Sequence, residues 1–217
     1  MTEKLVKQLF GFPVYHSSID KKKYDKNILK TILANFKKSK IRDNWNKNHN
    51  SFTNNKIHHS NGDELNKIFK QPNYDSLIPI YTKEINSYFS TMATKDFKYK
   101  FKIVNYTCMT KDYHMKSHVH TDCDFTAVHY LKFDKKTQDS TVFLNTNDYA
   151  KFIDILYPNT YNTFLKNHLT NSWILKYCKI LTKEDDLIIF PAMMEHSVPA
   201  IKSDKIRVTI VFNINII

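Results

Sequence analysis

Residues that could carry chemistry gather in a short segment of this 217-residue chain, Ser117–Asp124, with the sequence SHVHTDCD. On a strand, side chains two and four residues apart share one face, so His118, His120 and Asp122 are able to point into one cavity. A His-x-Asp pair supplies two metal ligands, and a third imidazole from a distant strand would complete a facial triad with open coordination positions. The alternative interpretation is a surface turn with ordinary polar residues.

A second group of candidates lies near the end of the chain. His196 follows the apolar run Leu187–Phe190, and Arg207 comes eleven residues later inside an otherwise apolar strand. Burying a lone charge is costly, so Arg207 needs an anionic partner, and a ligand carboxylate held through two hydrogen bonds is a natural one. Thr209 falls on the same face and adds a hydroxyl. The alternative is an edge-strand arginine with its head group in water.

These residues stand in blocks that resemble the Fe(II)/2-oxoglutarate-dependent dioxygenases, in particular the 2OG-Fe(II) oxygenases of bacteria and phages. His118–Leu131 is similar to the family's H-x-H…S-G-V-Y-Y-L block, and Phe190–Pro199 is similar to its F-P-S-W-L-x-H-x-V block. Arg207–Asn213 is similar to its R-I-S-I-S-F-N strand. The opening Leu9–Val14 also resembles the family's L-F-x-T-P-I start.

The resemblance implies a double-stranded β-helix, which is a jelly-roll or cupin-like barrel, and an oxidoreductase that hydroxylates a C–H bond. Its metal would be Fe(II), and its cosubstrates would be O2 and 2-oxoglutarate, which is decarboxylated to succinate. Arg207, assisted by Thr209, would hold the distal carboxylate of 2-oxoglutarate. Tyr106, on the strand before the metal block, is either a further hydrogen-bond donor to the cosubstrate or a barrel-packing residue.

Family alignment and ligand chemistry predict different metal ligands. The alignment places the family's H-x-H on His118 and His120, whereas a 2-His-1-carboxylate triad uses His120, Asp122 and His196. We favour the mixed triad as the catalytic set, because its carboxylate neutralises charge on the metal. His118 remains the alternate ligand, or a group that supports a ligand through a hydrogen bond.

The sequence departs from the family pattern beside these ligands. Thr126 and Ala127 replace the family's Ser-Gly, and His129 replaces its first Tyr. His129 therefore either lines the cavity or faces the other side of its strand. Such changes alter the pocket shape, so the family's substrates are less transferable than its ligands.

Periodicity predicts helices early in the chain and strands later. Apolar residues at helical spacing predict helices over Asp25–Lys38 and Leu77–Met92, separated by a polar loop over 44–63. The later segments are predicted as strands over Phe101–Tyr106, Phe125–Phe133, Thr141–Leu144, Leu187–Phe190 and Ile206–Ile216, with a helix over Asp148–Leu156.

We therefore expect one domain over residues 1–217 that is mainly β with flanking helices. Helical support from residues 1–96, including the 44–63 loop, would buttress a barrel core over residues 97–217. Only two glycines, Gly11 and Gly62, are present, which excludes a P-loop and a glycine-rich dinucleotide fingerprint.

Composition indicates an intracellular protein with a preference for anionic partners. We see no apolar stretch of the roughly 18 residues that a membrane helix needs, and no signal-length apolar segment. Three widely spaced cysteines fit a reducing compartment, so we expect a cytoplasmic protein, and the phage resemblance suggests a viral protein in host cytoplasm. The net charge of +12 raises the expectation of a polyanionic partner.

The sequence leaves the substrate open among a protein or peptide, a nucleic acid and a small molecule. In the 44–63 loop, aromatic and basic side chains could grip a nucleic-acid strand, although a solvated loop is the simpler interpretation; these are Trp45, Lys47, Phe52, Lys56, His58 and His59. Two other classes of function compete with the oxygenase: a non-catalytic cupin-like binding module and a basic nucleic-acid-binding protein. A metal-only module would have no need for Arg207 with Thr209.

Overall fold

The computed structural model describes residues 5–9, 11–39, 57–61, 67–92, 96–147 and 175–217, together with six isolated positions between 152 and 163. In chain order the elements are β1 (Leu5–Leu9), β2 (Phe12–Ser18), α1 (Asn27–Lys38), β3 (Ile57–His59), α2 (Ile78–Ser90), β4 (Tyr99–Met109), β5 (Met115–His118), β6 (Phe125–Lys132), β7 (Val142–Leu144), β8 (Tyr177–Lys179), β9 (Asp186–Pro191), β10 (His196–Val198) and β11 (Arg207–Ile216).

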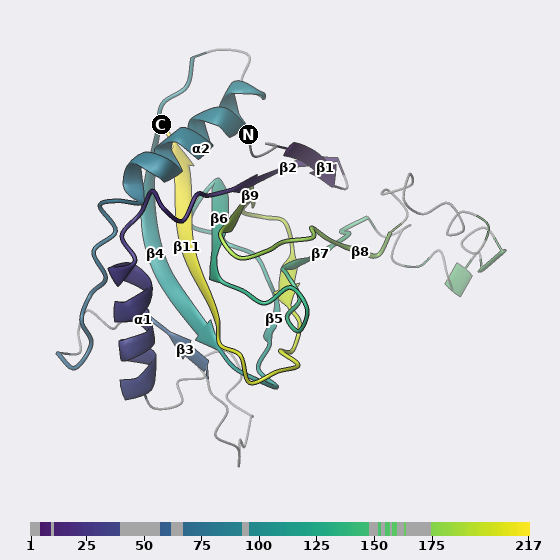
Figure 1. The fold of residues 1–217 in the computed structure, drawn as a ribbon. Helices are drawn as coiled ribbons and strands as arrows, with labels where there is room; N and C mark the ends of the chain where they lie inside the picture. Colours follow the sequence, from purple (N-terminus) through teal and green to yellow (C-terminus); the bar gives the residue numbers. More distant parts are fainter. Residues whose placement is uncertain are drawn as a thin grey trace.

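Two antiparallel sheets make up most of the described structure (Figure 1). The larger sheet has seven strands in the order β1-β2-β9-β6-β11-β4-β3, and the smaller has four in the order β5-β10-β7-β8. Most strands that are neighbours in a sheet are distant in sequence, so both sheets are held together by long-range pairing. Helices α1 and α2 lie on the side of the larger sheet that faces away from the smaller one (Figure 1). The predicted mainly β fold with flanking helices is confirmed.

The long strand β11 organises the larger sheet, because it pairs with β4 on one side and with β6 on the other. Its side chains alternate between two environments. One face carries apolar residues into the core beneath the helices, namely Val208, Ile210, Phe212 and Ile214. The opposite face carries the residues that line a pocket between the sheets, namely Arg207, Thr209, Val211 and Asn213. Core and pocket are therefore fixed by the same strand.

Both predicted helices form, and each buries the stripe that predicted it. In α1 the buried apolar residues are Ile28, Ile32 and Phe36. In α2 they include Tyr81, whose ring stacks on Phe212 of β11 with the centroids 4.4 Å apart. This stack anchors α2 to the centre of the larger sheet.

A second apolar cluster lies beside the pocket, on the inner face of the larger sheet. It includes Tyr130, Phe143 and Phe190, and the rings of Phe143 and Phe190 meet edge to face at 4.8 Å. Since Phe143 belongs to β7 and Phe190 to β9, this contact joins the two sheets.

The N-terminal part differs from the prediction of a helical support, because it adds strands to the larger sheet. Strands β1 and β2 extend this sheet beyond β9, and β3 inside the predicted 44–63 loop pairs with the end of β4. In β2, His16 and Ser18 bond to Asp186 of β9, a partner about 170 residues away. Polar strands stabilised by such distant partners have no local apolar pattern.

The predicted helix over 148–156 lies largely outside the described residues.

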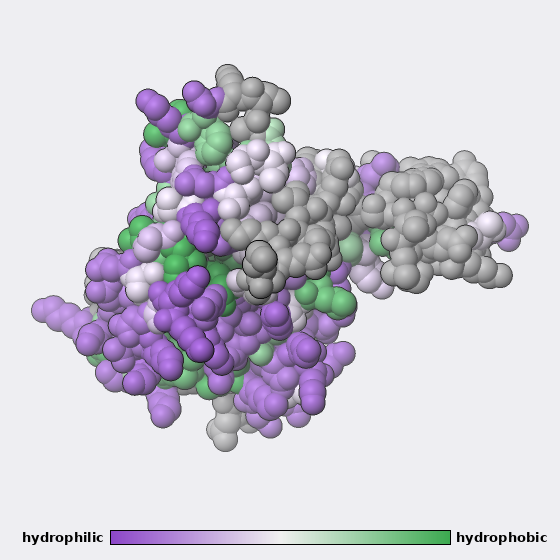
Figure 2. Space-filling model, turned by 45° about the horizontal axis from the view of Figure 1, so that its top comes forward, coloured by the Kyte–Doolittle hydropathy of each residue, from purple (hydrophilic) through white to green (hydrophobic). Residues whose placement is uncertain are grey.

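Among the described residues, each helix falls short of the length and hydrophobicity that a membrane crossing requires. The coloured surface in Figure 2 is mainly hydrophilic, and its hydrophobic side chains form small areas between polar ones.

Asn35 of α1 is a buried hub that ties the helix to β4. Its side-chain amide donates to the Lys70 carbonyl at 2.8 Å and to the Tyr106 hydroxyl at 2.9 Å, and its oxygen accepts from the Lys70 amide. Replacing Asn35 with Ala removes one hydrogen bond from the buried Tyr106 hydroxyl and two from the part-buried Lys70 backbone, so we expect the free energy of unfolding to fall by about 1–3 kcal/mol. Urea unfolding measures this change, with Lys30→Ala on the exposed face of α1 as control. Equal stability of both variants would contradict the assigned role of Asn35.

Candidate active site

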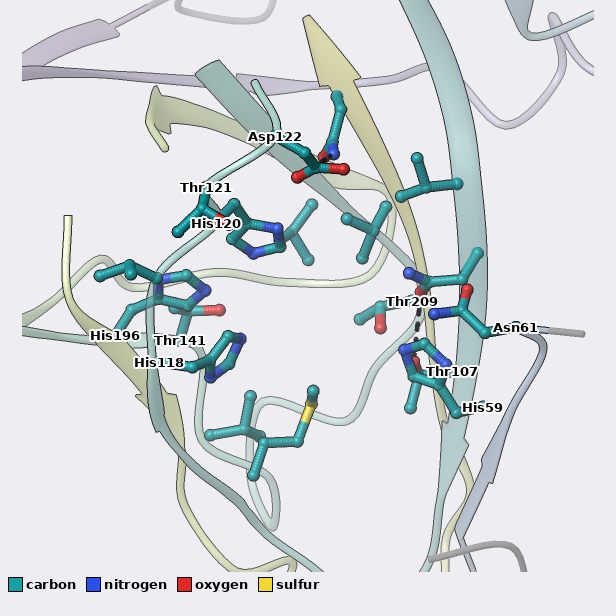
Figure 3. A pocket seen from close by; sticks show the side chains of 18 of the residues that line it. His59, Asn61, Thr107, His118, His120, Thr121, Asp122, Thr141, His196 and Thr209 are labelled. Atoms are coloured by element: carbon teal, nitrogen blue, oxygen red, sulfur yellow. Dashed lines mark hydrogen bonds between the residues drawn. The ribbon is translucent and has the colours of Figure 1, made fainter. Parts of the chain in front are cut away.

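A pocket of about 260 Å³ lies between the two sheets and collects most of the predicted site residues. Figure 3 shows its two walls: histidines from the smaller sheet face polar side chains from β3, β4 and β11 across the cavity. The lining residues that the sequence analysis singled out are His118, His120, Asp122, His196, Arg207 and Thr209. Segments up to about 100 residues apart in sequence thus converge on one space.

Three histidines form a compact group at this pocket. His118 at the end of β5 is the cross-strand partner of His196 at the start of β10. His120 follows β5, where its backbone N–H donates to the Ala192 carbonyl at 2.9 Å. One ring nitrogen from each of the three histidines lies within 4.8 Å of the others, which is close enough for a shared metal ion.

Backbone contacts orient two of the three imidazoles. The Nδ1 atom of His118 lies 2.7 Å from the Lys116 carbonyl, and that of His196 lies 2.8 Å from the Met194 carbonyl. A carbonyl only accepts hydrogen bonds, so each Nδ1 carries the proton and donates. The Nε2 atom of each ring is then left with its lone pair available for a metal, as is usual for metal-bound histidines.

Burial keeps His120 and His196 uncharged. Desolvation, reinforced by the neighbouring His118, lowers the pKa of His196 to about 3. The pKa of His120 is lowered for the same two reasons, although Asp122 opposes the shift. Neutral imidazoles are the form that binds metal ions, so these two rings need not lose a proton at neutral pH.

The carboxylate of Asp122 does not join this group among the described residues. Asp122 lies at the exposed rim of the pocket, where its Oδ1 accepts a hydrogen bond of 3.2 Å from the Asn213 amide. Strand β5 ends at His118, so the alternation that would align Asp122 with the histidines does not continue. The geometry favours the alternate set of His118, His120 and His196, and the mixed set with Asp122 remains a prediction.

Arg207 is a buried cation on the same pocket wall as Thr209. Its side chain is 2% exposed, with its guanidinium carbon 5.2 Å from the Tyr130 ring centroid and its Nη1 3.7 Å from the Met109 sulfur. No described carboxylate lies within ion-pairing distance, and Nε has no hydrogen-bond partner. Burial lowers the Arg207 pKa. A guanidinium without a counter-ion that lines a pocket is suited to an anionic ligand.

Two candidates whose position the sequence left open, Tyr106 and His129, lie on the helix side of the larger sheet. The Tyr106 hydroxyl contacts Asn35 and His58, so this side chain packs on the helix side of β4 and does not reach the pocket. His129 also faces the helices, and its Nδ1 pairs with the Tyr81 hydroxyl at 2.8 Å. Strand alternation decides both cases, because neighbours of Tyr106 and His129 line the pocket instead.

Strand β3 supplies a pocket wall that the sequence analysis missed. His59 and Asn61 face the three grouped histidines, His118, His120 and His196, across the cavity (Figure 3). His58 and His59 are buried rather than exposed on a loop, and the other predicted loop contacts lie outside the described residues, namely Trp45, Lys47, Phe52 and Lys56. In the sequence, the single sign of a strand at β3 is the apolar residue Ile57 before two histidines.

The two sheets have the arrangement of a double-stranded β-helix, and the pocket between them holds a histidine group suited to a metal ion. The model of the family described as “Putative 2OG-Fe(II) oxygenase” matches residues 105–213, which is half of the chain. The chain belongs to this 2OG-Fe(II) oxygenase family, whose members use Fe(II) and 2-oxoglutarate. No curated protein matches the sequence.

Solved structures share the fold at low sequence identity. HygX from Streptomyces hygroscopicus, solved with nickel, 2-oxoglutarate and hygromycin B, is 9% identical with a TM-score of 0.50, over 96% of this chain and 83% of that one. A viral collagen prolyl hydroxylase from Paramecium Bursaria Chlorella virus-1 is 15% identical, with a TM-score of 0.48 over 92% and 94%. A 2OG-Fe(II) oxygenase family protein from Burkholderia pseudomallei is 13% identical, with a TM-score of 0.42 over 64% of this chain and 56% of that one.

His59 makes the stability of the protein depend on pH. Burial, together with His58 and His118, lowers the pKa of His59 from 6.5 to about 4. Between these values the unfolded chain binds a proton that the folded protein does not, so the free energy of unfolding falls as the pH drops from 6.5 towards 4. One such group contributes at most about 1.4 kcal/mol per pH unit.

Urea unfolding across this pH range tests the contribution of His59. In His59→Asn, which cannot take up the proton, we expect a shallower loss of stability than in the wild type. His114→Asn, which alters a histidine outside the pocket lining, is the control. Identical slopes in wild type and His59→Asn would show that His59 titrates normally.

Proposed function

We propose that this protein is an Fe(II)- and 2-oxoglutarate-dependent dioxygenase that hydroxylates a C–H bond of its substrate, with residues 1–217 acting as one oxygenase domain. The observation that carries the proposal is the pairing of two features in one pocket. One is a group of three histidine nitrogens within 4.8 Å of one another, and the other is a buried guanidinium without an anionic partner. A metal ion and a carboxylate-bearing cosubstrate would satisfy both.

His118, His120 and His196 would hold the metal. The carbonyls of Lys116 and Met194 fix the tautomers of two of these rings, which prepares their Nε2 atoms as ligands. Three protein ligands leave coordination positions for a chelating cosubstrate and for O2. The mixed triad of His120, Asp122 and His196 is the competing assignment, and Asp122 would have to leave its hydrogen bond to Asn213 to join it.

Arg207 would bind the distal carboxylate of 2-oxoglutarate, and the Thr209 hydroxyl would assist it. Thr141 also lines the pocket and shares a hydrogen bond of 2.8 Å with the Tyr130 hydroxyl, beneath the guanidinium. The apolar side chains of Val128, Val198 and Val211 complete the lining and limit the water that reaches the bound cosubstrate. When bound, Fe(II) with 2-oxoglutarate supplies the oxidising chemistry of the family, in which 2-oxoglutarate is converted to succinate and CO2.

Anaerobic titration of Fe(II) and 2-oxoglutarate into the purified protein tests the metal set. We expect wild type to develop the weak visible charge-transfer band of the chelate. Removal of a group that only supports a ligand costs roughly 10- to 100-fold in metal affinity, so loss of a ligand in His118→Ala or His196→Ala should cost at least this much. Asp122→Asn should retain the band.

His114→Ala is the control for this titration, because His114 does not line the pocket. A band that is lost in Asp122→Asn but kept in His118→Ala would establish the mixed triad instead. Metal binding without any band would favour the non-catalytic cupin-like module, and the absence of metal binding would reject the proposal.

A second prediction separates a ligand-binding role of Arg207 from a structural one. Arg207→Met removes a buried charge and keeps an apolar side chain of similar length, so the free energy of unfolding should stay constant or rise. The same variant should bind 2-oxoglutarate about 100-fold more weakly, since charge-assisted hydrogen bonds contribute about 1.5–3 kcal/mol each.

Calorimetric titration of the Mn(II)-loaded protein, with urea unfolding in parallel, measures both quantities. Lys202→Met, which alters an exposed cation outside the pocket, serves as the control. A variant Arg207→Met that unfolds more easily yet binds 2-oxoglutarate normally would assign Arg207 to the core.

A further inference from the structure

Strand β4 has an open outer edge that leads to the pocket, and we propose that an extended acidic peptide binds along it as the substrate. This inference rests on the proposed function, because it assigns the substrate class of that site. The peptide would add a strand to the larger sheet beside residues 99–105 and would bring its target side chain to the pocket at Asn105.

The edge is open because β3 covers only the end of β4. Strand β3 pairs with Thr107–Met109. The pairing ends at Ser60, whose hydroxyl accepts from the Tyr106 N–H at 2.9 Å and whose N–H donates to the Tyr106 carbonyl at 3.0 Å. Over residues 99–105, no described residue forms a hydrogen bond to the outer side of the β4 backbone. Unpaired backbone groups at a sheet edge are a template for another extended chain.

A cavity runs along this edge. It has a volume of about 520 Å³ and lies between β4 and the segment that leads into α2, which passes beside β4 in Figure 1. Its lining residues are Pro72, Asn73, Tyr74, Asp75, Ile78, Phe101, Lys102 and Ile103. Ile78 is 45% exposed although it belongs to this lining. The cavity therefore offers a mostly uncharged space for side chains of an added strand.

Three lysines give the edge its charge preference. Lys98, just before β4, and Lys100 and Lys102 within it are exposed and stand at every second position. Lys102 is the cross-strand partner of Asn213, which lines the pocket, so its side chain lies on the pocket face of the sheet. No described carboxylate lies within ion-pairing distance of these lysines, and Asp75 is the single acid of the cavity lining.

This spacing specifies the pattern of the peptide. Side chains of an added strand project to one face at every second residue, as the lysines do, so acidic residues at alternating positions would pair with them. The row ends where Val104 and Asn105 enter the pocket lining. The residue to be hydroxylated would therefore lie next to the acidic segment, at the end nearest Asn105.

A peptide explains the edge better than a nucleic acid does. A phosphate backbone would use the lysines but would leave the N–H and C=O groups of β4 unmatched. A peptide backbone satisfies both the charges and the hydrogen-bonding groups. Single-stranded DNA is therefore the competing probe in the experiment.

The test measures binding of a fluorescent peptide of about eight residues, roughly 26 Å as a strand, in which Glu alternates with Val. We expect the double variant Lys100→Glu/Lys102→Glu to bind it at least about tenfold more weakly, because two attractions become repulsions. The matched control is Lys135→Glu/Lys136→Glu, which reverses two exposed lysines in the turn after β6 and should bind normally. All of these lysines are exposed, so unfolding midpoints should be unchanged.

Backbone methylation of the peptide distinguishes strand addition from simple charge attraction. Two peptides are compared, with N-methyl groups either on the Glu or on the Val residues. An added strand directs alternate N–H groups to β4, so one peptide should lose at least about tenfold in affinity and the other should bind nearly as well. Equal binding of both, or tighter binding of an oligo-dT strand than of the acidic peptide, would overturn the proposal.

Peptide binding is measured without Fe(II) and 2-oxoglutarate, so the outcome is independent of the proposed catalysis. If the protein forms the Fe(II)–2-oxoglutarate chelate but does not bind the peptide, the edge proposal is refuted and the oxygenase assignment stands. A protein that binds the peptide in a methylation-dependent manner but forms no chelate would refute the oxygenase assignment and keep the edge as a binding site.

Discussion

The pocket depends on the pairing of β11 with a strand on each side. This strand cannot shift its register by one residue without exchanging Arg207 for Val208, which would put a guanidinium under the helices and an apolar side chain into the pocket. Pairing with β4 and β6 prevents such a shift along most of its length. The stack of Phe212 on Tyr81 adds a further constraint from the helix side. Core packing therefore holds Arg207 in place on the pocket wall.

The histidine group depends on a different constraint, which is the pairing of two short strands in the smaller sheet. β5 and β10 contribute four and three residues, and the cross-strand pair of His118 and His196 places two rings 4.3 Å apart. In the metal-free protein, repulsion between charged rings would oppose this proximity. Burial avoids the repulsion by keeping His196 neutral. The larger sheet thus positions the Arg207 guanidinium, and the smaller sheet positions the His118 and His196 imidazoles.

Elements with a strong local pattern could be predicted from the sequence. The stripes of α1 and α2, the alternation in β4 and β11, and the β-branched and aromatic residues of β6 predicted these five elements. Strands β2 and β3 could not be predicted in this way. His16 and Ser18 in β2 and His58 in β3 are polar side chains stabilised by partners distant in sequence.

The candidate site was predictable in its residue types and less so in its geometry. Arg207 and Thr209 follow from one uninterrupted strand, and the structure places both in the pocket. The ligand set was harder, because its prediction assumed that a strand continues from His118 to Asp122. The strand ends at His118, and the following turn carries the carboxylate of Asp122 to Asn213 instead. Turn geometry, which alternation does not encode, decides the outcome.

The position of Asp122 has an energetic consequence for the proposed cosubstrate. Three neutral imidazoles leave the full charge on a divalent metal, and Arg207 adds another positive charge to the same cavity. A dianion such as 2-oxoglutarate compensates both charges at once, whereas a ligand carboxylate from Asp122 would already compensate part of the metal charge. Binding of the metal and of 2-oxoglutarate must then favour each other, by the same factor in both directions. In the proposed three-histidine site this coupling would be stronger, so the cosubstrate rather than the protein alone would complete the metal site.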